Sequence, residues 1–157
     1  MKNLIIIGAG GYAKSVLDSV DYMNFRMIGF IDDIKRIGSE HLGYPIIGNT
    51  IDCVNKPEDC VYFVAIGNNR KRKVWFNKLK ERQLSLINVI DKSAIVSQYS
   101  TIGEGSFIGK LAIVNHGASV GDNCVINTRA LLEHGCRIEN HVNISTNCTL
   151  NGDVVCE

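Results

Sequence analysis

The sequence predicts two folds in one chain: an α/β unit built on a small parallel sheet, followed by a β-solenoid. Two observations lead to this expectation. In the first half, apolar runs of strand length alternate with segments of helical period, and from residue 95 onward the chain repeats every six residues without an insertion. A chain of 157 residues has room for two small domains, which we place at 1–90 and 91–157.

The first half contains four candidate strands and two candidate helices. The strands are Leu4–Ile7, Met27–Ile31, Val61–Ile66 and Leu86–Ile90, and the helices are Tyr12–Met23 and Arg70–Arg82. Strands that alternate with helices favour a parallel sheet covered on both faces. Because only about four strands fit, we predict a small Rossmann-like unit.

A glycine-rich turn joins the first strand to the first helix. Gly8, Gly10 and Gly11 belong to the stretch GAGGYA, which fits the pattern G-x-G-x-x-A in the context that phosphate binding requires. Asp32 and Asp33 follow about twenty residues later at the end of the next strand, as in dinucleotide-binding folds. The unit is too short for two mononucleotide halves, so one nucleoside diphosphate fits better. A tight turn without a ligand is the alternative.

The second half parses into ten consecutive hexads. They are IVSQYS, TIGEGS, FIGKLA, IVNHGA, SVGDNC, VINTRA, LLEHGC, RIENHV, NISTNC and TLNGDV. The second place is always aliphatic and the sixth is always small or compact, which is typical of a left-handed parallel β-helix of hexapeptide repeats. Each aliphatic side chain is expected to point into the prism and stack on its counterpart 18 residues away, and full burial is worth roughly 1.5–3 kcal/mol.

The repeat also predicts the surroundings of the cysteines. Cys124, Cys136 and Cys148 occupy the compact sixth place, where they are expected to act as small hydrophobes. No C-x-x-C pair occurs among the six cysteines, so we expect reduced thiols and no metal site.

Two histidines fall in one column of the predicted prism. His116 and His134 are 18 residues apart, at the fourth place of their hexads, outside the prism at or next to a corner. Asn115 and Glu133 form the adjacent column. An imidazole held on a rigid corner beside a carboxylate is a reasonable general base. The alternative is a turn histidine that is exposed to solvent or contacts another subunit.

The composition argues against several partners. The formal net charge is +1, which gives no electrostatic reason to expect nucleic acid or an anionic membrane. The segment Arg70–Arg82 holds seven lysines and arginines, but its helical period predicts a solvated helix face. The apolar run Leu4–Ile7 is too short for a signal peptide or a membrane span, so we expect a cytoplasmic protein.

Four motifs, in this order along the chain, give a family resemblance: GAGGYAKSVLDSV, FIDD, AIGNN and INTRALLEHGCRI. The chain resembles hexapeptide-repeat acyltransferases of the group formed by sialic acid O-acetyltransferases and UDP-4-amino-sugar N-acetyltransferases, which includes the bacillosamine-pathway enzymes. The resemblance spans the whole chain. It implies acetyl-CoA as co-substrate, direct acetyl transfer to a sugar, and a homotrimer with the donor site between neighbouring prisms.

The resemblance also assigns roles in the β-helix. It implies that His134 is the general base, that Glu133 orients it, and that Asn127 lines the same site. Relatives have a second histidine nine residues after the base, where it helps to hold acetyl-CoA. Here that position is Asn143, which can still donate and accept hydrogen bonds. His141 lies two places earlier, and the sequence assigns no role to it or to His116.

In the first unit the resemblance implies a nucleotide-sugar acceptor. Its diphosphate is expected near the loop Gly8–Gly11 and its base near Asp32 and Asp33. Asn68 and Arg70, at the end of the third strand, are further candidates for contact. Tyr12 stands where relatives commonly have a histidine, which leaves the identity of the acceptor open.

Four functions stay open on the sequence alone. The leading one is acetylation of the amino group of a nucleotide-activated 4-amino sugar. The others are O-acetylation of sialic acid, nucleotide-sugar binding by a non-catalytic paralogue with an incomplete CoA site, and NAD(P)-dependent oxidoreduction. Only the glycine loop supports the last of these. Because 23 residues follow His134 and relatives continue for further coils, the sequence also suggests a fragment, a natural truncation or a protein without full activity.

Overall fold

The computed structural model describes residues 1–157, and the chain divides into two compact units. The first is Met1–Ile87 and the second is Asn88–Glu157, so the division lies three residues before the boundary expected from the sequence. No helix in either unit is long and apolar enough to cross a membrane.

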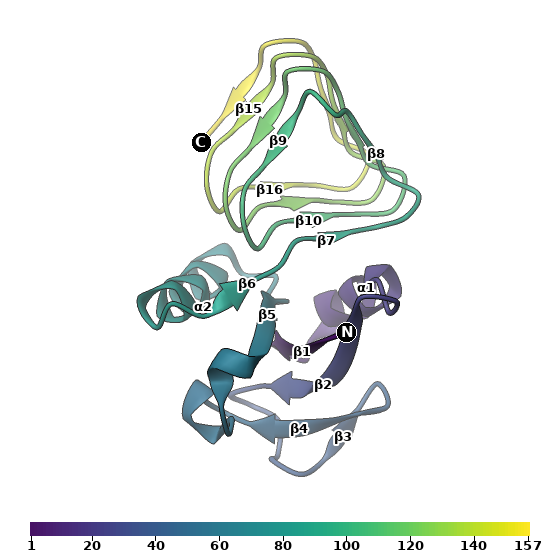
Figure 1. Ribbon diagram of the computed structural model, residues 1–157. Helices are drawn as coiled ribbons and strands as arrows, with labels where there is room; N and C mark the ends of the chain where they lie inside the picture. Colours follow the sequence, from purple (N-terminus) through teal and green to yellow (C-terminus); the bar gives the residue numbers. More distant parts are fainter. The chain divides into compact units, whose positions relative to one another are not determined.

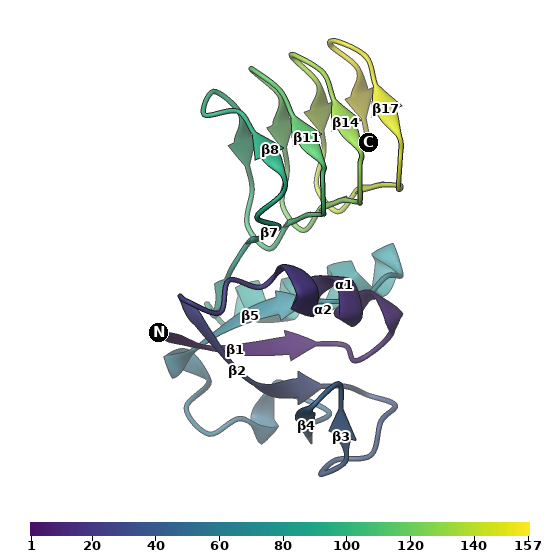
Figure 2. The ribbon, with the colours of Figure 1, turned by 90° about the vertical axis from the view of Figure 1, so that its right-hand side faces the viewer.

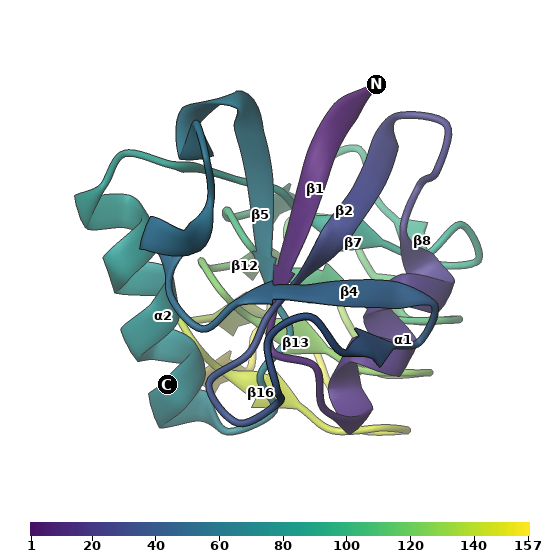
Figure 3. The ribbon, with the colours of Figure 1, turned by 90° about the horizontal axis from the view of Figure 1, so that it is seen from below.

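The first unit is built on a six-stranded sheet with the order β3-β4-β2-β1-β5-β6. The strands are β1 (Lys2–Ile7), β2 (Phe25–Ile31), β3 (Glu40–His41), β4 (Tyr44–Gly48), β5 (Cys60–Val64) and β6 (Ser85–Leu86). All neighbours run parallel except β3 and β4, which form an antiparallel hairpin. The side-by-side arrangement of β5, β1 and β2 can be followed in Figure 3.

The central strand β1 is buried on both of its faces. Residues Leu4–Ile7 are all at most 1% exposed, as expected of a parallel strand covered on both sides. Ile5 and Ile7 share a hydrophobic cluster with Leu79 of helix α2 (Asn69–Glu81) and with Ile51 of the short 3-10 helix η1 (Ile51–Cys53). A second 3-10 helix, η2, spans Pro57–Asp59.

Some predicted elements differ from the structure. Strands β3 and β4 were not predicted, because β3 has only two residues and β4 carries Pro45, which a strand tolerates only near an edge. Helix α1 (Gly11–Ser19) ends before Met23, since Val20 is extended and a turn follows it. The expected strand Leu86–Ile90 is split: β6 belongs to the sheet, and β7 (Val89–Ile90) begins the second unit.

The second unit is a left-handed parallel β-helix with three sides, seen end-on in Figure 1 and as stacked coils in Figure 2. Each side is a four-stranded parallel sheet: β7, β10, β13 and β16; β8, β11, β14 and β17; β9, β12, β15 and β18. The remaining bounds are β8 (Ile95–Val96), β9 (Thr101–Ile102), β10 (Phe107–Ile108), β11 (Ile113–Val114), β12 (Ser119–Val120), β13 (Val125–Ile126), β14 (Leu131–Leu132), β15 (Arg137–Ile138), β16 (Asn143–Ile144), β17 (Thr149–Leu150) and β18 (Val155–Cys156).

The register confirms the predicted columns. Val114 pairs with Leu132, and Leu132 pairs with Leu150, so residues 18 apart lie above one another. The second and sixth places of the hexads form the prism core, in which Leu132 and Cys136 are completely buried. The Cys136 thiol donates to the carbonyl oxygen of Asn151 at 3.1 Å, so this cysteine fills the interior as the repeat predicts.

The corners of the prism depend on one left-handed residue in each turn. From Gly105 to Asp153, the fifth place of every hexad has φ between 55° and 72°. Glycine, asparagine or aspartate, which tolerate this conformation best, occupies six of these nine places. This backbone pattern gives the corner residues fixed positions from one coil to the next.

Candidate active site and nucleotide pocket

His134 lies at the corner of the prism between β14 and β15. Its side chain is 68% exposed, and Gly135 makes the turn with φ 69°. Backbone hydrogen bonds tie this turn to both neighbouring coils: Gly135 N donates to His116 O at 3.2 Å, and Asp153 N donates to His134 O at 2.9 Å. A solvent-accessible imidazole is therefore held on a rigid backbone.

The column above His134 continues with a glycine. Gly152 lies 18 residues later, and a Cβ built on it would come within 2.6 Å of His134 Nε2. The ring of His134 thus packs directly over the backbone of the next coil. In the other direction, His116 stacks on Tyr99 with ring centroids 4.6 Å apart.

Two carboxylates, those of Glu133 and Asp153, lie near this corner and contact different side chains. Asn115 donates to Glu133 Oε2 at 3.1 Å, which joins the predicted adjacent column across two coils. Asp153 Oδ1 lies 4.0 Å from His134 Nδ1. The carboxylate that the structure places 4.0 Å from His134 Nδ1 is therefore that of Asp153 in the next coil, which was not among the predicted site residues, and the two groups form an ion pair only when the imidazole is protonated. Counting by 18 places position 153 above position 135, next to His134, but does not give the direction in which its side chain points.

The other candidate residues of the β-helix lie elsewhere around the prism. Asn127 is in the turn between β13 and β14, one corner before His134, and its Oδ1 accepts from the N–H of Thr128 at 2.8 Å. Asn143 is exposed on β16, on the side bounded by the other two corners. His141 lies at the third corner, with its Nδ1 2.8 Å from Asn123 Nδ2. A single chain therefore does not bring His134, Asn127 and Asn143 together.

The glycine loop of the first unit lines a pocket of about 290 Å³. Gly8, with φ 94°, has no space for a side chain, since a Cβ would meet Ile66 Cγ1 at 2.7 Å. Gly10 and Gly11 open α1 and have open space above them, so a ligand can approach their backbone. The predicted residues Asp32 and Asp33 line the same pocket as the three glycines.

Asp32 has a structural duty at this loop. Its Oδ2 accepts from Ala9 N at 2.7 Å, and its Oδ1 accepts from Ile34 N at 2.9 Å and Lys35 N at 2.8 Å. Partial burial by itself raises the pKa of the Asp32 carboxyl, but the three backbone donors outweigh it and hold this pKa below its ordinary value. The Asp32 carboxylate therefore fixes the glycine loop to the end of β2, while Asp33 lines the pocket.

Asp32→Asn is expected to destabilise the first unit by about 1–2 kcal/mol, because an amide cannot accept from all three N–H groups. Because the folded-state pKa is lowered, the carboxylate stabilises the fold above the ordinary carboxyl pKa, and this contribution is lost as the pH falls through the folded-state value. The difference from wild type should thus shrink on acidification.

Urea unfolding followed by the fluorescence of Trp75, the single tryptophan, measures this difference in unfolding free energy. Asp33→Asn is the matched control. An Asp32→Asn midpoint equal to wild type at neutral pH would contradict the assignment.

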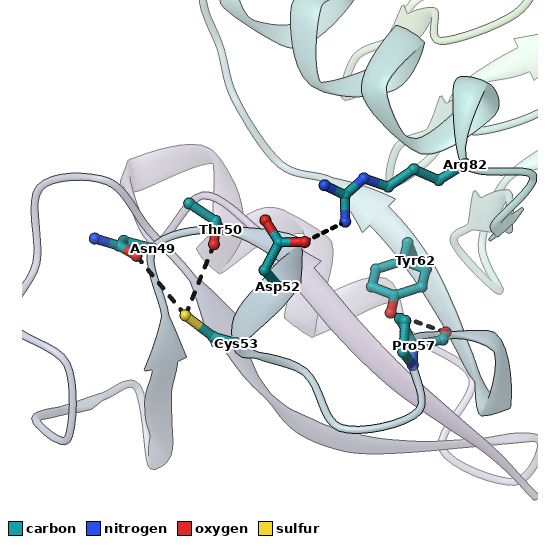
Figure 4. A network of polar contacts seen from close by, with 7 residues as sticks. All are labelled: Asn49, Thr50, Asp52, Cys53, Pro57, Tyr62 and Arg82. Atoms are coloured by element: carbon teal, nitrogen blue, oxygen red, sulfur yellow. Dashed lines mark hydrogen bonds and ion pairs between the residues drawn. The ribbon is translucent and has the colours of Figure 1, made fainter.

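A second pocket of about 570 Å³ lies along α2. Arg70, predicted as a contact residue, lines it together with Asp33, and Lys71 and Trp75 line both pockets. At its rim Arg82 donates to Asp52 Oδ1 at 2.7 Å (Figure 4). Lys71 and Trp75 were not predicted as pocket residues, because the basic helix was interpreted as a solvated face.

Helix α2 corrects that interpretation further. Arg72 is 1% exposed, and its guanidinium donates to Asn69 Oδ1 at 2.9 Å and to the carbonyl oxygen of Ile66 at 3.3 Å. It therefore supports the loop after β5 from inside. Asn68 caps this helix by accepting from Lys71 N at 3.0 Å and lines neither pocket. Burial raises the pKa of the Tyr12 hydroxyl far above its usual range, so this group stays protonated where it lines the smaller pocket.

Each of the two units matches the model of a known protein family. The model of the PglD N-terminal domain matches residues 3–79, and that of the bacterial transferase hexapeptide (six repeats) matches residues 99–134. UDP-N-acetylbacillosamine N-acetyltransferase of Bacillus subtilis (strain 168) is 34% identical over 112 residues. This match covers 69% of the chain and 51% of the relative, so the chain spans about half the length of that protein.

Solved structures resemble the whole chain. A histidine-to-asparagine mutant of perosamine N-acetyltransferase from Caulobacter crescentus, in complex with CoA and GDP-perosamine, is 30% identical with a TM-score of 0.89, over 99% of this chain and 74% of that one. The acetyltransferase domain of PglB from Neisseria gonorrhoeae, in complex with acetyl coenzyme A, is 27% identical with a TM-score of 0.83, over 98% and 87%. The chain therefore belongs to the hexapeptide-repeat sugar acetyltransferase family that includes the bacillosamine and perosamine N-acetyltransferases.

Proposed function

We propose that this protein transfers the acetyl group of acetyl-CoA to the amino group of a nucleotide-activated 4-amino sugar. One observation carries the proposal: an exposed imidazole stands on a fixed corner of a hexapeptide β-helix, in a chain whose other unit has a glycine-loop nucleotide pocket. The names and bound molecules of the relatives, among them CoA with GDP-perosamine, support the donor and the class of acceptor.

His134 acts as general base in the proposed reaction. Its Nε2 takes a proton from the acceptor amine as the nitrogen attacks the thioester carbonyl of acetyl-CoA. A C–N bond forms, the C–S bond breaks, and the proton passes to the leaving CoA sulfur. A positioned base typically contributes about 10²–10⁴-fold to such a step. No covalent acyl-enzyme is required.

The nucleotide of the acceptor is assigned to the first unit. Its diphosphate lies against the open backbone of Gly10 and Gly11, where the start of α1 favours negative charge, and Lys71, which lines the same pocket, supplies a cation. The base lies toward Asp33 and Trp75, which line both pockets, with Arg70 in the larger one. This assignment leaves Asn68 as a helix cap only.

A homotrimer is part of the proposal. His134, Asn127 and Asn143 occupy different places around one prism, so a site that uses all three takes them from neighbouring chains. Exposed apolar side chains on the same unit, such as Ile95 (63%) and Leu111 (57%), are suited to be covered by a partner. Light scattering is expected to show three chains per particle, and a monomer under native conditions would argue against a shared donor site.

A thiol-release assay with an acceptor panel tests the function. The wild-type protein is given acetyl-CoA with a UDP-4-amino sugar, GDP-perosamine, sialic acid or no acceptor, and the products are identified by mass spectrometry. We expect CoA release and an acetylated product with at least one of the two 4-amino sugars. Turnover with sialic acid alone would favour O-acetylation, and no turnover with any acceptor would favour a non-catalytic sugar-binding protein.

Gly152→Ala is expected to lower kcat about tenfold, because the added Cβ would meet the His134 ring at 2.6 Å and displace it. Gly152 does not have a positive φ, so alanine fits its backbone and the melting temperature should stay close to that of wild type. Steady-state kinetics and thermal unfolding measure the two effects. An unchanged kcat would mean that the position of the ring over Gly152 is unimportant for the reaction.

A further inference from the structure

We propose that Asp153 is a positioning residue for His134 and that it, rather than Glu133, orients the imidazole. The inference rests on the proposed function, in which His134 is the base. The resemblance to acyltransferases implies that Glu133, which directly precedes the base, orients the imidazole. The structure instead places a carboxylate from the next coil of the prism 4.0 Å from the imidazole.

The geometry distinguishes the two nitrogens of the ring. His134 Nδ1 is the atom that faces Asp153 Oδ1, at 4.0 Å. This distance exceeds a hydrogen bond, but catalytic hydrogen bonds in ligand-free proteins are often long and tighten when substrate binds. Because Nδ1 is the nitrogen closer to the carboxylate, Nε2 is the nitrogen that we assign to the proton of the acceptor amine.

The backbone of two coils makes room for this pair. Asp153 is the left-handed corner residue of its turn, with φ 63°, and its N–H donates to His134 O at 2.9 Å. A Cβ on Gly135 would overlap Asp153 Oδ1, and a Cβ on Gly152 would crowd the His134 ring. Two glycines in neighbouring coils therefore provide the space in which the imidazole and the carboxylate approach each other.

Glu133 is engaged on the other side of the corner. Its Oε2 accepts from Asn115 Nδ2 at 3.1 Å, in the preceding coil. The further titratable ring in this column, His116, stacks on Tyr99. Of the charged groups at this corner, Glu133 is thus tied to the preceding coil, and Asp153 is the carboxylate paired with His134.

The carboxylate would act through the tautomer of the ring. By accepting Nδ1–H, Asp153 favours the tautomer in which Nε2 carries a free lone pair, and it stabilises the imidazolium formed when Nε2 takes the proton of the amine. Both side chains are well exposed, at 68% and 79%, so the effect should be far smaller than in a buried triad.

The test compares Asp153→Asn, Asp153→Glu and Glu133→Gln in the full chain, with Glu139→Gln as control for the loss of an exposed carboxylate. With acetyl-CoA and GDP-perosamine or a UDP-4-amino sugar, Asp153→Asn should lower kcat about tenfold and leave KM within about twofold. Asp153→Glu should restore part of the rate, and Glu139→Gln should behave as wild type.

Nitrogen NMR of the His134 ring supplies a readout that a merely structural role would not move. The Nδ1–H tautomer should dominate in the wild type and in Glu133→Gln, and its fraction should fall in Asp153→Asn. A wild-type kcat or an unchanged tautomer ratio in Asp153→Asn would overturn the inference, as would a fall of that ratio in Glu133→Gln alone. The NMR measurement needs no turnover. An inactive wild type would therefore refute the proposed function, while the tautomer ratio would still show whether Asp153 orients the His134 ring.

Discussion

His134→Ala is expected to lower kcat for acetyl transfer by about 10²–10⁴-fold while KM for acetyl-CoA changes little, because the substitution removes the proposed base and leaves the coil intact. The side chain is exposed and takes no part in the prism core, so the fold should not depend on it. Thiol release at saturating acetyl-CoA measures the rate, and circular dichroism checks that the β-helix remains.

His116→Ala is the matched control for this prediction. His116 lies in the same column one coil earlier and is engaged with Tyr99. If alanine at His134 and alanine at His116 reduce kcat by the same small factor, neither imidazole is the base. A wild-type rate with alanine at His134 would remove the proposed mechanism altogether.

Leu132→Ala is expected to have the largest effect on stability, a loss of about 2–5 kcal/mol in the free energy of unfolding of the β-helix. Leu132 is completely buried between Val114 and Leu150, and the rigid coils on both sides cannot close the cavity that alanine would leave. Because Trp75 belongs to the other unit, far-ultraviolet circular dichroism is the suitable probe.

Leu132→Met provides the comparison, since it conserves volume and should cost less than about 1.5 kcal/mol. Equal unfolding midpoints for the alanine and methionine variants would mean that this column does not form the core of the prism. The same pair of variants also shows whether the corner at His134, two residues later, keeps its activity when the interior below it is weakened.

The β-helix could be predicted from the sequence almost completely, because its structural period is a fixed number of residues: three hexads make one coil. The stacking of Val114, Leu132 and Leu150 follows from counting by 18, and so does the column of His116, His134 and Gly152. What counting does not give is the direction of side chains. The pairing of His134 with Asp153 depends on where two corner turns point their atoms.

The first unit was harder to predict, because its strands and helices are fixed by contacts between distant segments. The glycine loop and the aspartates after β2 were found by their order in the chain. The burial of Arg72 was not predicted, although the residue lies on the same helix face as the buried Phe76 and Leu79. An arginine is rarely buried unless its guanidinium is paired, and its contacts with Ile66 and Asn69 do not follow from the helical period. The short hairpin of β3 and β4 has the same origin, since it exists through its pairing with β2.

The role of His134 is tested most directly by its ring resonances, observed while acetyl-CoA is added to the wild-type protein, with His41 of the first unit as an internal reference. In the proposed mechanism the thioester of acetyl-CoA lies at the corner between β14 and β15, so the His134 signals should shift with saturation and those of His41 should not. Signals of His134 that stay in place while acetyl-CoA binds elsewhere on the protein would contradict it.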